Sequence, residues 1–275
     1  MNISSERLFH LISVKNPAPS ASPEAGFGSD DASTGRFFTR FGAALDLEGK
    51  RVLDVGCGTG SVCIEAARRG ASRVVGIDMQ LVDVARRRLR EIQPSLADVV
   101  DFVETVGELG ELGGETFDVI FSKDSFEHYA DPERFVHVIT RFLAPGGSLV
   151  IGFGPLWKAP SGGHIDYMTR VPWAHLAFPE EVIMKERRRF RPDEHAERFE
   201  DIVGGLNKIT LGRFRSIMSS SGLDCAFFAT NVSDKPAVRV MKTLSRIPAL
   251  REFLTINVYS IWRKPSLSSG TSIGA

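Results

Sequence analysis

The stretch from Arg51 to Gly60, which reads RVLDVGCGTG, constrains the fold of this chain more than any other segment. An apolar run, Val52–Val55, stops at three glycines spaced G-x-G-x-G, and a helical pattern follows. This order predicts a buried strand, a tight turn and then a helix. Because Gly56, Gly58 and Gly60 lack Cβ atoms, a ligand can approach the backbone of the turn.

A second apolar segment, Arg73–Asp78, ends in a carboxylate 18 residues after Gly60. We interpret it as the second strand, with Asp78 placed at its carboxyl end to accept hydrogen bonds from two ribose hydroxyls. Capping the N-terminus of the next helix is the alternative role for this residue. The two motifs together predict a nucleoside-containing cofactor.

The spacing of the glycines and the acid before them indicate which cofactor this is. A dinucleotide fingerprint reads G-x-G-x-x-G and places a pyrophosphate at a helix N-terminus, whereas here the third glycine comes one residue early. Asp54, two residues before the first glycine, would repel a pyrophosphate and attract an ammonium group. An amino-acid-bearing nucleoside, S-adenosylmethionine (SAM), fits both features.

In these residues the sequence resembles the class I SAM-dependent methyltransferases of the small-molecule type, whose first motif has the same D-x-G-C-G-T-G pattern. The resemblance covers about residues 36–155 and continues more weakly to about residue 264. It implies that Asp54 orients the loop and the methionine ammonium, that Asp78 holds the ribose and that Met79 lies against the adenine. The expected cofactor contacts are Asp54, Gly56, Cys57, Gly58, Gly60, Asp78, Met79, Val106, Gly107, Ser122 and Lys123.

After the third strand the sequence departs from the family pattern, which has an acid near the adenine amino group. The place of that acid falls on Val106 in this chain. Backbone groups of Val106 and Gly107 are therefore the expected adenine contacts. Glu104 and Glu108 are the alternative sources of the missing side chain.

Two histidines are candidates for the catalytic base. His128 follows the fourth strand, where the resemblance places the transferred methyl group, and His164 follows the loop after the fifth strand. A histidine pKa near neutrality suits proton removal from an acceptor, although His128 can also serve only to fix its loop. The insertion contains two further histidines, His175 and His195.

The cluster Asp124, Glu127 and His128 offers a second interpretation of the same segment. Its D-x-x-E-H pattern resembles a metal site of some methyltransferases, with Asp in place of the first Glu. Oxygen and imidazole ligands at this spacing converge on one side of a helix, and His164 or His175 would have to complete the set. We treat this site as a minority alternative and expect no metal.

Apolar strands alternate with helical patterns along the chain, which predicts a parallel sheet covered on both faces. The predicted strands are 52–55, 73–78, 99–103, 117–122 and 148–153, and the helices are 37–47, 81–92 with an arginine-rich outer face at 86–90, 131–143 and 209–221. Further strands are predicted at 224–231 and 253–263, and the resemblance implies that they are the sixth and seventh strands, the seventh antiparallel. The expected fold is α/β, with a Rossmann-like seven-stranded, mostly parallel sheet.

We divide the chain accordingly, with an insertion after the fifth strand as a cap over the site. The predicted parts are a flexible leader (1–35), a SAM-binding core (36–153), a cap that binds substrate (154–205), the C-terminal part of the same sheet (206–265) and a disordered tail (266–275). The cap concentrates Trp157, Tyr167, Trp173 and Phe178, which suits an apolar or planar acceptor.

Composition excludes several classes of partner. Lys plus Arg and Asp plus Glu number 34 each, so the neutral chain has no overall electrostatic attraction for nucleic acid. Three cysteines without paired spacing, no secretory signal and no apolar run of about 20 residues predict a cytoplasmic protein without a membrane span.

The expected function is methyl transfer from SAM to a small acceptor, with oxygen favoured over carbon or nitrogen because of the nearby histidines. A SAM-binding scaffold or regulator without methyl transfer is one alternative. A nicotinamide-dependent oxidoreductase is the other, disfavoured by the glycine spacing and by Asp54.

Overall fold

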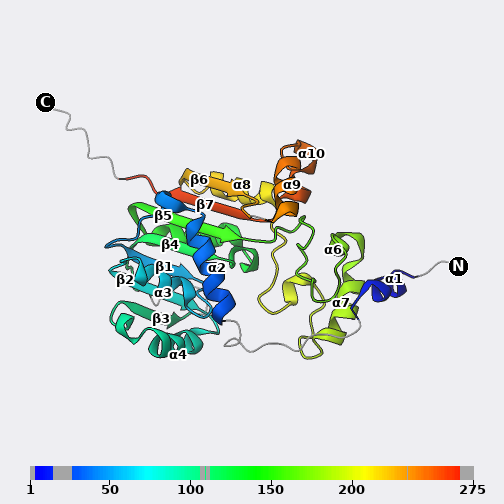
Figure 1. Ribbon diagram of the computed structural model, residues 1–275, viewed down its shortest axis with the longest axis horizontal. Coiled ribbons are helices and arrows are strands. Elements are labelled where there is room, and N and C mark those ends of the chain that lie inside the picture. The colour runs from blue at the N-terminus through cyan, green and yellow to red at the C-terminus, as the bar shows by residue number, and fades with distance from the viewer. Residues whose placement is uncertain (1–3, 15–26, 106–108, 110–111, 234, 267–275) are drawn as a thin grey trace.

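The computed structural model describes residues 4–14, 27–105, 109, 112–233 and 235–266 (Figure 1). Its centre is a seven-stranded sheet in the order β3-β2-β1-β4-β5-β7-β6. The strands are β1 (Arg51–Val55), β2 (Arg73–Asp78), β3 (Val100–Glu104), β4 (Phe117–Lys123), β5 (Leu143–Phe153), β6 (Asp224–Thr230) and β7 (Val258–Arg263). Strands β1 to β5 run parallel, whereas β7 lies antiparallel between β5 and β6. The predicted α/β class and the antiparallel seventh strand are confirmed.

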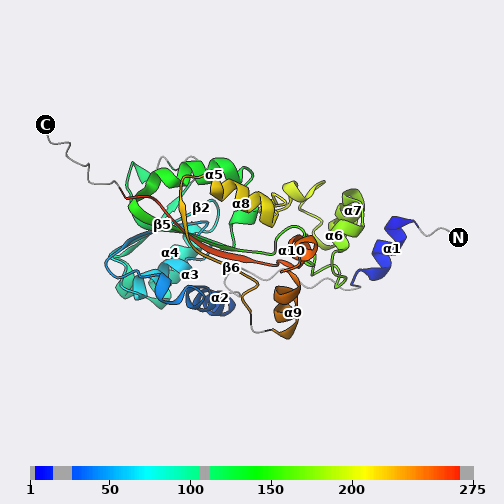
Figure 2. The same ribbon diagram turned by 90° about the horizontal axis from the view of Figure 1, so that it is seen from above.

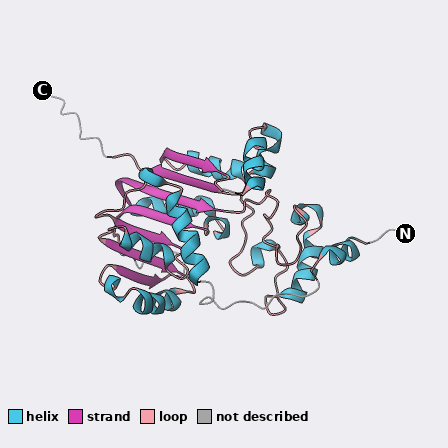
Figure 3. Ribbon diagram, in the orientation of Figure 1, coloured by secondary structure: helices cyan, strands magenta, loops and turns pink. Residues whose placement is uncertain are grey.

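Helices cover both faces of the sheet (Figure 2; Figure 3). One face carries α2 (Phe27–Thr39), α3 (Ser61–Arg68) and α4 (Val82–Ile92), and the other carries α5 (Pro132–Ile139) and α8 (Leu211–Ser219). Successive strand residues alternate between the two cores: Leu53 and Val55 pack on the α5 side, and Val52 packs on the α3 side. Strands buried on both faces explain the unbroken apolar runs in the sequence.

The predicted start of α5 is confirmed. Asp131 is the N-cap, and its side chain accepts a hydrogen bond of 2.9 Å from the backbone N–H of Arg134. Pro132 occupies the first helical position, where a missing N–H costs no hydrogen bond. The helix then ends at Ile139, followed by a 3₁₀ turn, Thr140–Phe142.

The segment between β5 and α8 contains α6 (Ala174–Ala177) and α7 (Glu180–Phe190) and has a hydrophobic core of its own. Helix α1 (Ser5–Ile12) belongs to this cluster, because Phe9 is fully buried in it. The other buried members are Ile165, Met168, Ala174, Ile183, Met184, Ala196, Phe199, Ile202 and Leu206. The predicted limits of the cap and its role over the site stay predictions.

Part of the predicted flexible leader is helical. Ser4 caps α1 by accepting a hydrogen bond from the N–H of Arg7, and α2 begins at Phe27. Both helices have packing partners, α1 on α7 and α2 on α3, which the polar, glycine-containing sequence did not indicate. Residues 15–26 lie outside the described part of the chain, as do residues 267–275 of the predicted disordered tail.

Several predicted boundaries were wrong. The fifth strand begins at Leu143 rather than at 148, so it includes the residues that separate the predicted helix from the predicted strand. The helix predicted over 37–47 is the C-terminal part of α2, which stops at Thr39 before a 3₁₀ turn at Gly42–Ala44. The last strand begins at Val258 rather than at 253, because α10 (Pro248–Leu254) and the unpredicted α9 (Pro236–Leu244) fill the connection from β6 to β7. Prolines at the first positions of both helices start them sharply. None of the described helices is long and apolar enough to cross a membrane.

Candidate cofactor site

The glycine-rich loop joins β1 to α3 and has left-handed backbone at all three glycines, with φ of 73°, 53° and 80° at Gly56, Gly58 and Gly60. A Cβ on Gly56 would lie 2.5 Å from the Ser125 hydroxyl, and one on Gly60 would lie 2.6 Å from the Phe102 ring. A Cβ on Gly58 would meet no atom within 4 Å. Two glycines are therefore required by packing, whereas Gly58 faces open space that a ligand can enter.

Asp78 at the end of β2 accepts hydrogen bonds from the backbone of the glycine-rich loop and from the turn before α4, and its ribose contact stays a prediction. Its Oδ2 accepts a hydrogen bond of 3.0 Å from the N–H of Gly58. Its Oδ1 accepts bonds of 2.9 and 3.0 Å from the N–H groups of Gln80 and Leu81, just before α4. The carboxylate thus fixes the loop and the start of a helix while remaining partly exposed beside Met79, whose exposed fraction is 63%.

A cleft of about 190 Å³ opens where β1 and β4 end. Its charged lining consists of three carboxylates, Asp30, Asp54 and Asp124, and one ammonium, Lys123. The remaining lining residues are Gly56, Cys57, Gly58, Thr59, Ser61, Val62 and Ser125. Arg88 pairs with Asp30, and Lys123 pairs with Asp124. Among the described residues, Asp54 is therefore the acid of this lining without an ion-pair partner. An acid in this position favours a cationic ligand group and disfavours a pyrophosphate.

Asp54 lies under the loop with an exposed fraction of only 1%. Burial raises the pKa of this carboxyl to about 7, and the hydrogen bond from the Cys63 thiol at 3.5 Å opposes the shift only in part. Burial also keeps the pKa of the Cys63 thiol well above its usual range. Asp54 is therefore about half protonated at neutral pH, and a neighbouring cation would favour its carboxylate form.

Helix α2 contributes side chains to this site that the sequence did not reveal. Asp30 lines the cleft and accepts a hydrogen bond from the Thr59 hydroxyl, and Thr34 lies 2.8 Å from the hydroxyl of Ser61. Arg88 of α4, predicted to lie on an outer face, is 1% exposed. Its guanidinium binds Thr59 and forms ion pairs with Asp30 and Asp31. The loop is thus held between two helices.

The end of β4 closes the other side of the cleft. Lys123 lines the cleft and forms an ion pair of 2.7 Å with Asp124. Ser122 is fully buried, is not among the lining residues, and lies 3.2 Å from the hydroxyl of Tyr129. Ser125 donates to the carbonyl of Gly56 at 3.3 Å. Tyr129 and Ser125, which the sequence analysis missed, therefore connect β4 to the loop.

Comparison with known proteins agrees with this geometry. A family model described as a methyltransferase domain matches residues 53–151. The ubiquinone biosynthesis O-methyltransferase of Neisseria meningitidis serogroup C (strain 053442) is 34% identical over 140 residues, which cover 51% of this chain and 54% of that protein. The chain thus spans about half the length of the curated relatives it matches.

Solved structures share the fold at low sequence identity. An S-adenosylmethionine dependent methyltransferase from Mesorhizobium loti superposes with a TM-score of 0.53 and 17% identity, covering 85% of this chain and 96% of that one. The [4+2]-cyclase SpnF superposes with a TM-score of 0.55 and 19% identity, covering 93% and 86%. Residues 53–151 therefore match a methyltransferase domain, and the described sheet shares the fold of these solved structures.

Within the methyltransferase domain, the described site residues form one continuous edge. Asp54, Asp78 and Lys123 come from the carboxyl ends of neighbouring parallel strands, which is where ligands bind in open α/β sheets. Val106, Gly107 and the alternative Glu108 lie outside the described residues, so the expected adenine contacts stay predictions. Glu104 is exposed at the end of β3, beside Asp78 in the strand register.

Of the two candidate bases, His128 lies in the methyltransferase domain and His164 lies beyond it, and their ring centroids are 5.7 Å apart. His128 Nδ1 lies 2.6 Å from the carbonyl of Gly205. His164 Nε2 is buried without a hydrogen-bond partner, and burial lowers the pKa of this ring to about 4. Neither ring is among the residues lining the cleft, and His175, 2.6 Å from the Trp157 carbonyl, is buried in the segment after β5.

The side chains of the metal alternative have separate partners. Asp124 pairs with Lys123, one oxygen of Glu127 accepts from the N–H of Gly154 at 3.4 Å, and His128 faces Gly205. Burial raises the pKa of Glu127 to about 8, so it is largely protonated at neutral pH. Across the described part of the chain, no group of three or more His, Cys, Asp or Glu side chains is arranged to hold a metal ion.

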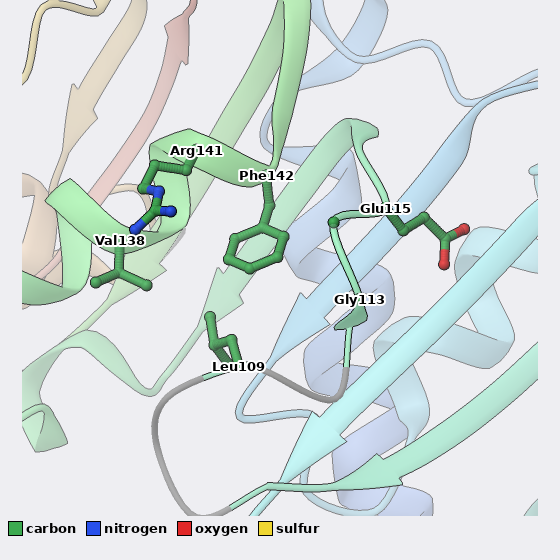
Figure 4. A pocket seen from close by; sticks show the side chains of 7 residues that line it. Leu109, Gly113, Glu115, Val138, Arg141 and Phe142 are labelled. Carbon is green, nitrogen blue, oxygen red and sulfur yellow. The ribbon is translucent and has the colours of Figure 1, made fainter.

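A second hollow of about 340 Å³ lies at the opposite edge of the methyltransferase domain, before β4 and β5 begin (Figure 4). It is lined by Leu109, Gly113, Gly114, Glu115, Val138, Arg141 and Phe142. None of the strand ends that carry the site residues reaches it. The smaller cleft is therefore the candidate site.

Proposed function

We propose that the protein is a SAM-dependent methyltransferase that acts on a small, apolar or planar acceptor, with oxygen as the favoured methyl-accepting atom. The observation that carries this proposal is the charge of the cleft, in which Asp54 is an acid without an ion-pair partner among the described residues. SAM has one carboxylate and two cationic groups, so its net charge is positive. A nicotinamide dinucleotide, with its pyrophosphate, has the opposite charge where it would meet the loop.

The residues present fit this cofactor in two further respects. Gly58 offers the open backbone that a nucleoside can approach. Asp78 is a partly exposed carboxylate fixed by the loop itself, which preorganises it to accept hydrogen bonds from ribose hydroxyls. In this proposal Asp54 and Asp30 face the ammonium, Lys123 faces the carboxylate and Met79 lies along the adenine.

When bound, SAM supplies an activated methyl group on a sulfonium, so the protein has chiefly to align the acceptor and remove its proton. Good alignment can lower a barrier by about 7–11 kcal/mol. His164 is the proposed base, since its Nε2 is buried, has no partner and is neutral at physiological pH. His128, 5.7 Å away, is the second candidate. The name of the Neisseria relative as an O-methyltransferase supports oxygen as the acceptor atom.

The segment 154–205 supports an apolar or planar acceptor. It follows β5 directly at the edge of the sheet that carries the site, and Figure 1 shows it beside the carboxyl ends of the strands. Its aromatic side chains pack around a separate core, which keeps this segment ordered next to the site. We propose that it binds the acceptor and excludes water. Three unpaired cysteines support a cytoplasmic setting for the reaction.

Calorimetric titration with SAM, S-adenosylhomocysteine and NAD tests cofactor identity. We expect the first two to bind and NAD to show no heat of binding. Incubation with methyl-labelled SAM and fractionated small-molecule extracts then tests transfer. Binding of SAM without label in any acceptor fraction would favour a SAM-dependent role without methylation, which the similarity of fold to a [4+2]-cyclase makes a specific alternative. Preferential binding of NAD would overturn the proposal.

A further inference from the structure

Helices α9 and α10 form a projection between β6 and β7 at the edge of the sheet that carries the site (Figure 1; Figure 2). The two helices contact each other, yet neither contributes a fully buried residue to the protein. Helices of a globular protein normally bury an apolar stripe against the core. The apolar residues of α9 and α10 are therefore not accounted for by packing against the core of the protein.

Exposed large apolar side chains recur along this projection every three or four residues. They are Val240, Leu244, Ile247, Leu250 and Phe253, with exposed fractions of 58%, 41%, 48%, 38% and 41%. Val240 and Leu244 are four residues apart on α9, and Leu250 and Phe253 are three apart on α10, so each pair lies on one side of its helix, while Ile247 is the N-cap of α10. Because α9 and α10 contact each other, these exposed apolar residues share one part of the surface, which makes it a candidate interaction site.

Positive charge accompanies the apolar residues. Residues 235–254 contain five cations, Lys235, Arg239, Lys242, Arg246 and Arg251, and a single acid, Glu252. The carboxylate of Glu252 is turned toward α8, where it accepts hydrogen bonds from the N–H groups of Leu211 and Gly212 at 3.2 and 2.8 Å. Since the whole chain has 34 residues of each sign, this positive charge is a local concentration.

We propose that the exposed residues of α9 and α10, here called the α9–α10 surface, dock onto an anionic lipid membrane. Aliphatic and phenylalanine side chains interspersed with Lys and Arg on a short helix suit the boundary between headgroups and acyl chains. Each cation adds attraction to anionic headgroups, and the attraction is weakened by salt. A second copy of the chain is the less suitable occupant, because two such surfaces would bring positive charges together.

The α9–α10 surface lies next to the beginning of the segment after β5. Lys158, at the start of the segment after β5, lies over the ring of Phe253 at 5.8 Å. Docking through α10 therefore brings the segment proposed to bind the acceptor beside the lipid. The docking itself does not depend on methyl transfer, and it is tested by binding alone.

Sedimentation with lipid vesicles is the direct test. We expect the protein to sediment with vesicles of phosphatidylcholine mixed with phosphatidylglycerol, and only weakly with vesicles of phosphatidylcholine alone. Binding should weaken as salt is raised. Equal affinity for the two kinds of vesicle, or none for either, would overturn the proposal.

Paired variants assign the binding to this surface. Lys242→Glu/Arg246→Glu and Leu244→Ser/Ile247→Ser should each lower the vesicle partition constant by at least about 10-fold. The matched control is Arg87→Glu/Arg90→Glu on α4, a charge change of the same size on another exposed basic helix, which should bind as the unmodified protein does. Unchanged thermal unfolding shows that each variant is folded.

Two outcomes would refute the assignment. If the α4 control loses as much binding as the variants of the α9–α10 surface, the attraction belongs to no particular surface. If light scattering instead shows a dimer that the variants of the α9–α10 surface dissociate, with no vesicle binding, the surface is a contact between two copies.

Discussion

The guanidinium of Arg88 donates hydrogen bonds to both the hydroxyl and the carbonyl of Thr59, at 2.8 and 3.3 Å. Thr59 lies in the glycine-rich loop, and Arg88 lies in the helix after the next strand. The same guanidinium pairs with Asp30 and Asp31 of α2. One buried side chain thus connects α2, the loop and α4.

We predict that Arg88→Met lowers the free energy of unfolding by about 1–3 kcal/mol and also weakens SAM binding, because Thr59 loses two donors. The acidic partners are partly exposed, which keeps this loss below that of a fully buried pair. Denaturant unfolding and calorimetric titration measure the two effects. Arg90→Met, at an exposed position of α4, should change stability by less than about 0.5 kcal/mol. An Arg88→Met protein that matches this control would show that the network has no energetic importance.

The pH dependence of stability should report on Asp54. The pKa of its carboxyl is about 7 in the folded protein and 3.8 in an unfolded chain, so the folded state holds a proton that the unfolded state releases. The stability contributed by this proton is fully present below about pH 4 and is lost as the pH rises through 7. Between pH 5 and 8 the loss should be on the order of 2–3 kcal/mol, and Asp54→Asn should remove it. Parallel stability profiles for the two proteins would show that Asp54 is ionised throughout.

A proton should also leave Asp54 when SAM binds, because a bound cation favours the carboxylate. SAM affinity is then expected to rise between pH 5.5 and 8. Calorimetry in two buffers with different enthalpies of ionisation measures the proton directly near pH 7. Uptake of a proton, or a flat affinity profile, would contradict this role.

Asp78 is expected to bind the ribose. Asp78→Asn removes the charge and leaves a single acceptor oxygen, which can serve the Gly58 N–H or the Gln80 N–H but not both, so SAM affinity should fall by about 10-fold or more. The sharper test compares S-adenosylhomocysteine with its 2′-deoxy analogue. The unmodified protein should prefer the hydroxylated ligand, and the variant should lose most of that preference. A preference that survives the substitution would assign the ribose to another residue.

If His164 removes the acceptor proton, His164→Gln should lower kcat by about 10²–10⁴-fold with little effect on SAM affinity. The pKa of this ring is lowered by burial to about 4, so the rate should show no limb from it between pH 6 and 8. His128→Gln provides the comparison at the neighbouring ring. Wild-type turnover in the His164 variant would leave this residue a packing role.

The aromatic residues of the segment after β5 distinguish acceptor binding from packing. Trp157 lies between the His175 and Phe199 rings, with centroids 4.8 and 4.9 Å away, and Trp173 donates to the carbonyl of Lys158 at 3.0 Å. We expect Trp157→Ala and Trp173→Ala to raise KM for the acceptor far more than KM for SAM. Lower thermal stability with unchanged acceptor kinetics would make both residues part of the core.

The sheet and the glycine-rich loop could be predicted because their residues carry local signals. Buried parallel strands need unbroken apolar runs, and the close contacts of Gly56 with Ser125 and of Gly60 with Phe102 need glycine. Asp78 was recognised as the acid at the end of a strand. Each of these features can be recognised within a few residues of the sequence.

The contribution of α2 could not be predicted in the same way. Asp30 lies in a run of Gly, Ser, Asp and Ala that is typical of a mobile segment. Its ion-pair partner, Arg88, lies 58 residues later in the chain. Arg88 itself belongs to an arginine-rich stretch that is typical of an exposed face. Only the folded structure shows that one of these arginines is buried among acids. Helices α9 and α10 were missed for a related reason, since their apolar residues have no core to face.

The burial of Phe9 has a consequence for how such proteins can be recombined. This ring packs at 4.9 Å from Phe178, and the N–H of Val14 donates to the carbonyl of Met168 at 2.7 Å. The hydrophobic core of the segment after β5 is thus completed by α1, which precedes all seven strands in the chain. A graft that carried only residues 154–205 into another scaffold would leave a hole the size of a phenylalanine side chain, whereas a graft that also carried residues 4–14 would bring a complete core. On the proposal that this segment binds the acceptor, exchanging acceptor specificity between relatives requires moving two separate pieces of the chain, residues 4–14 and residues 154–205.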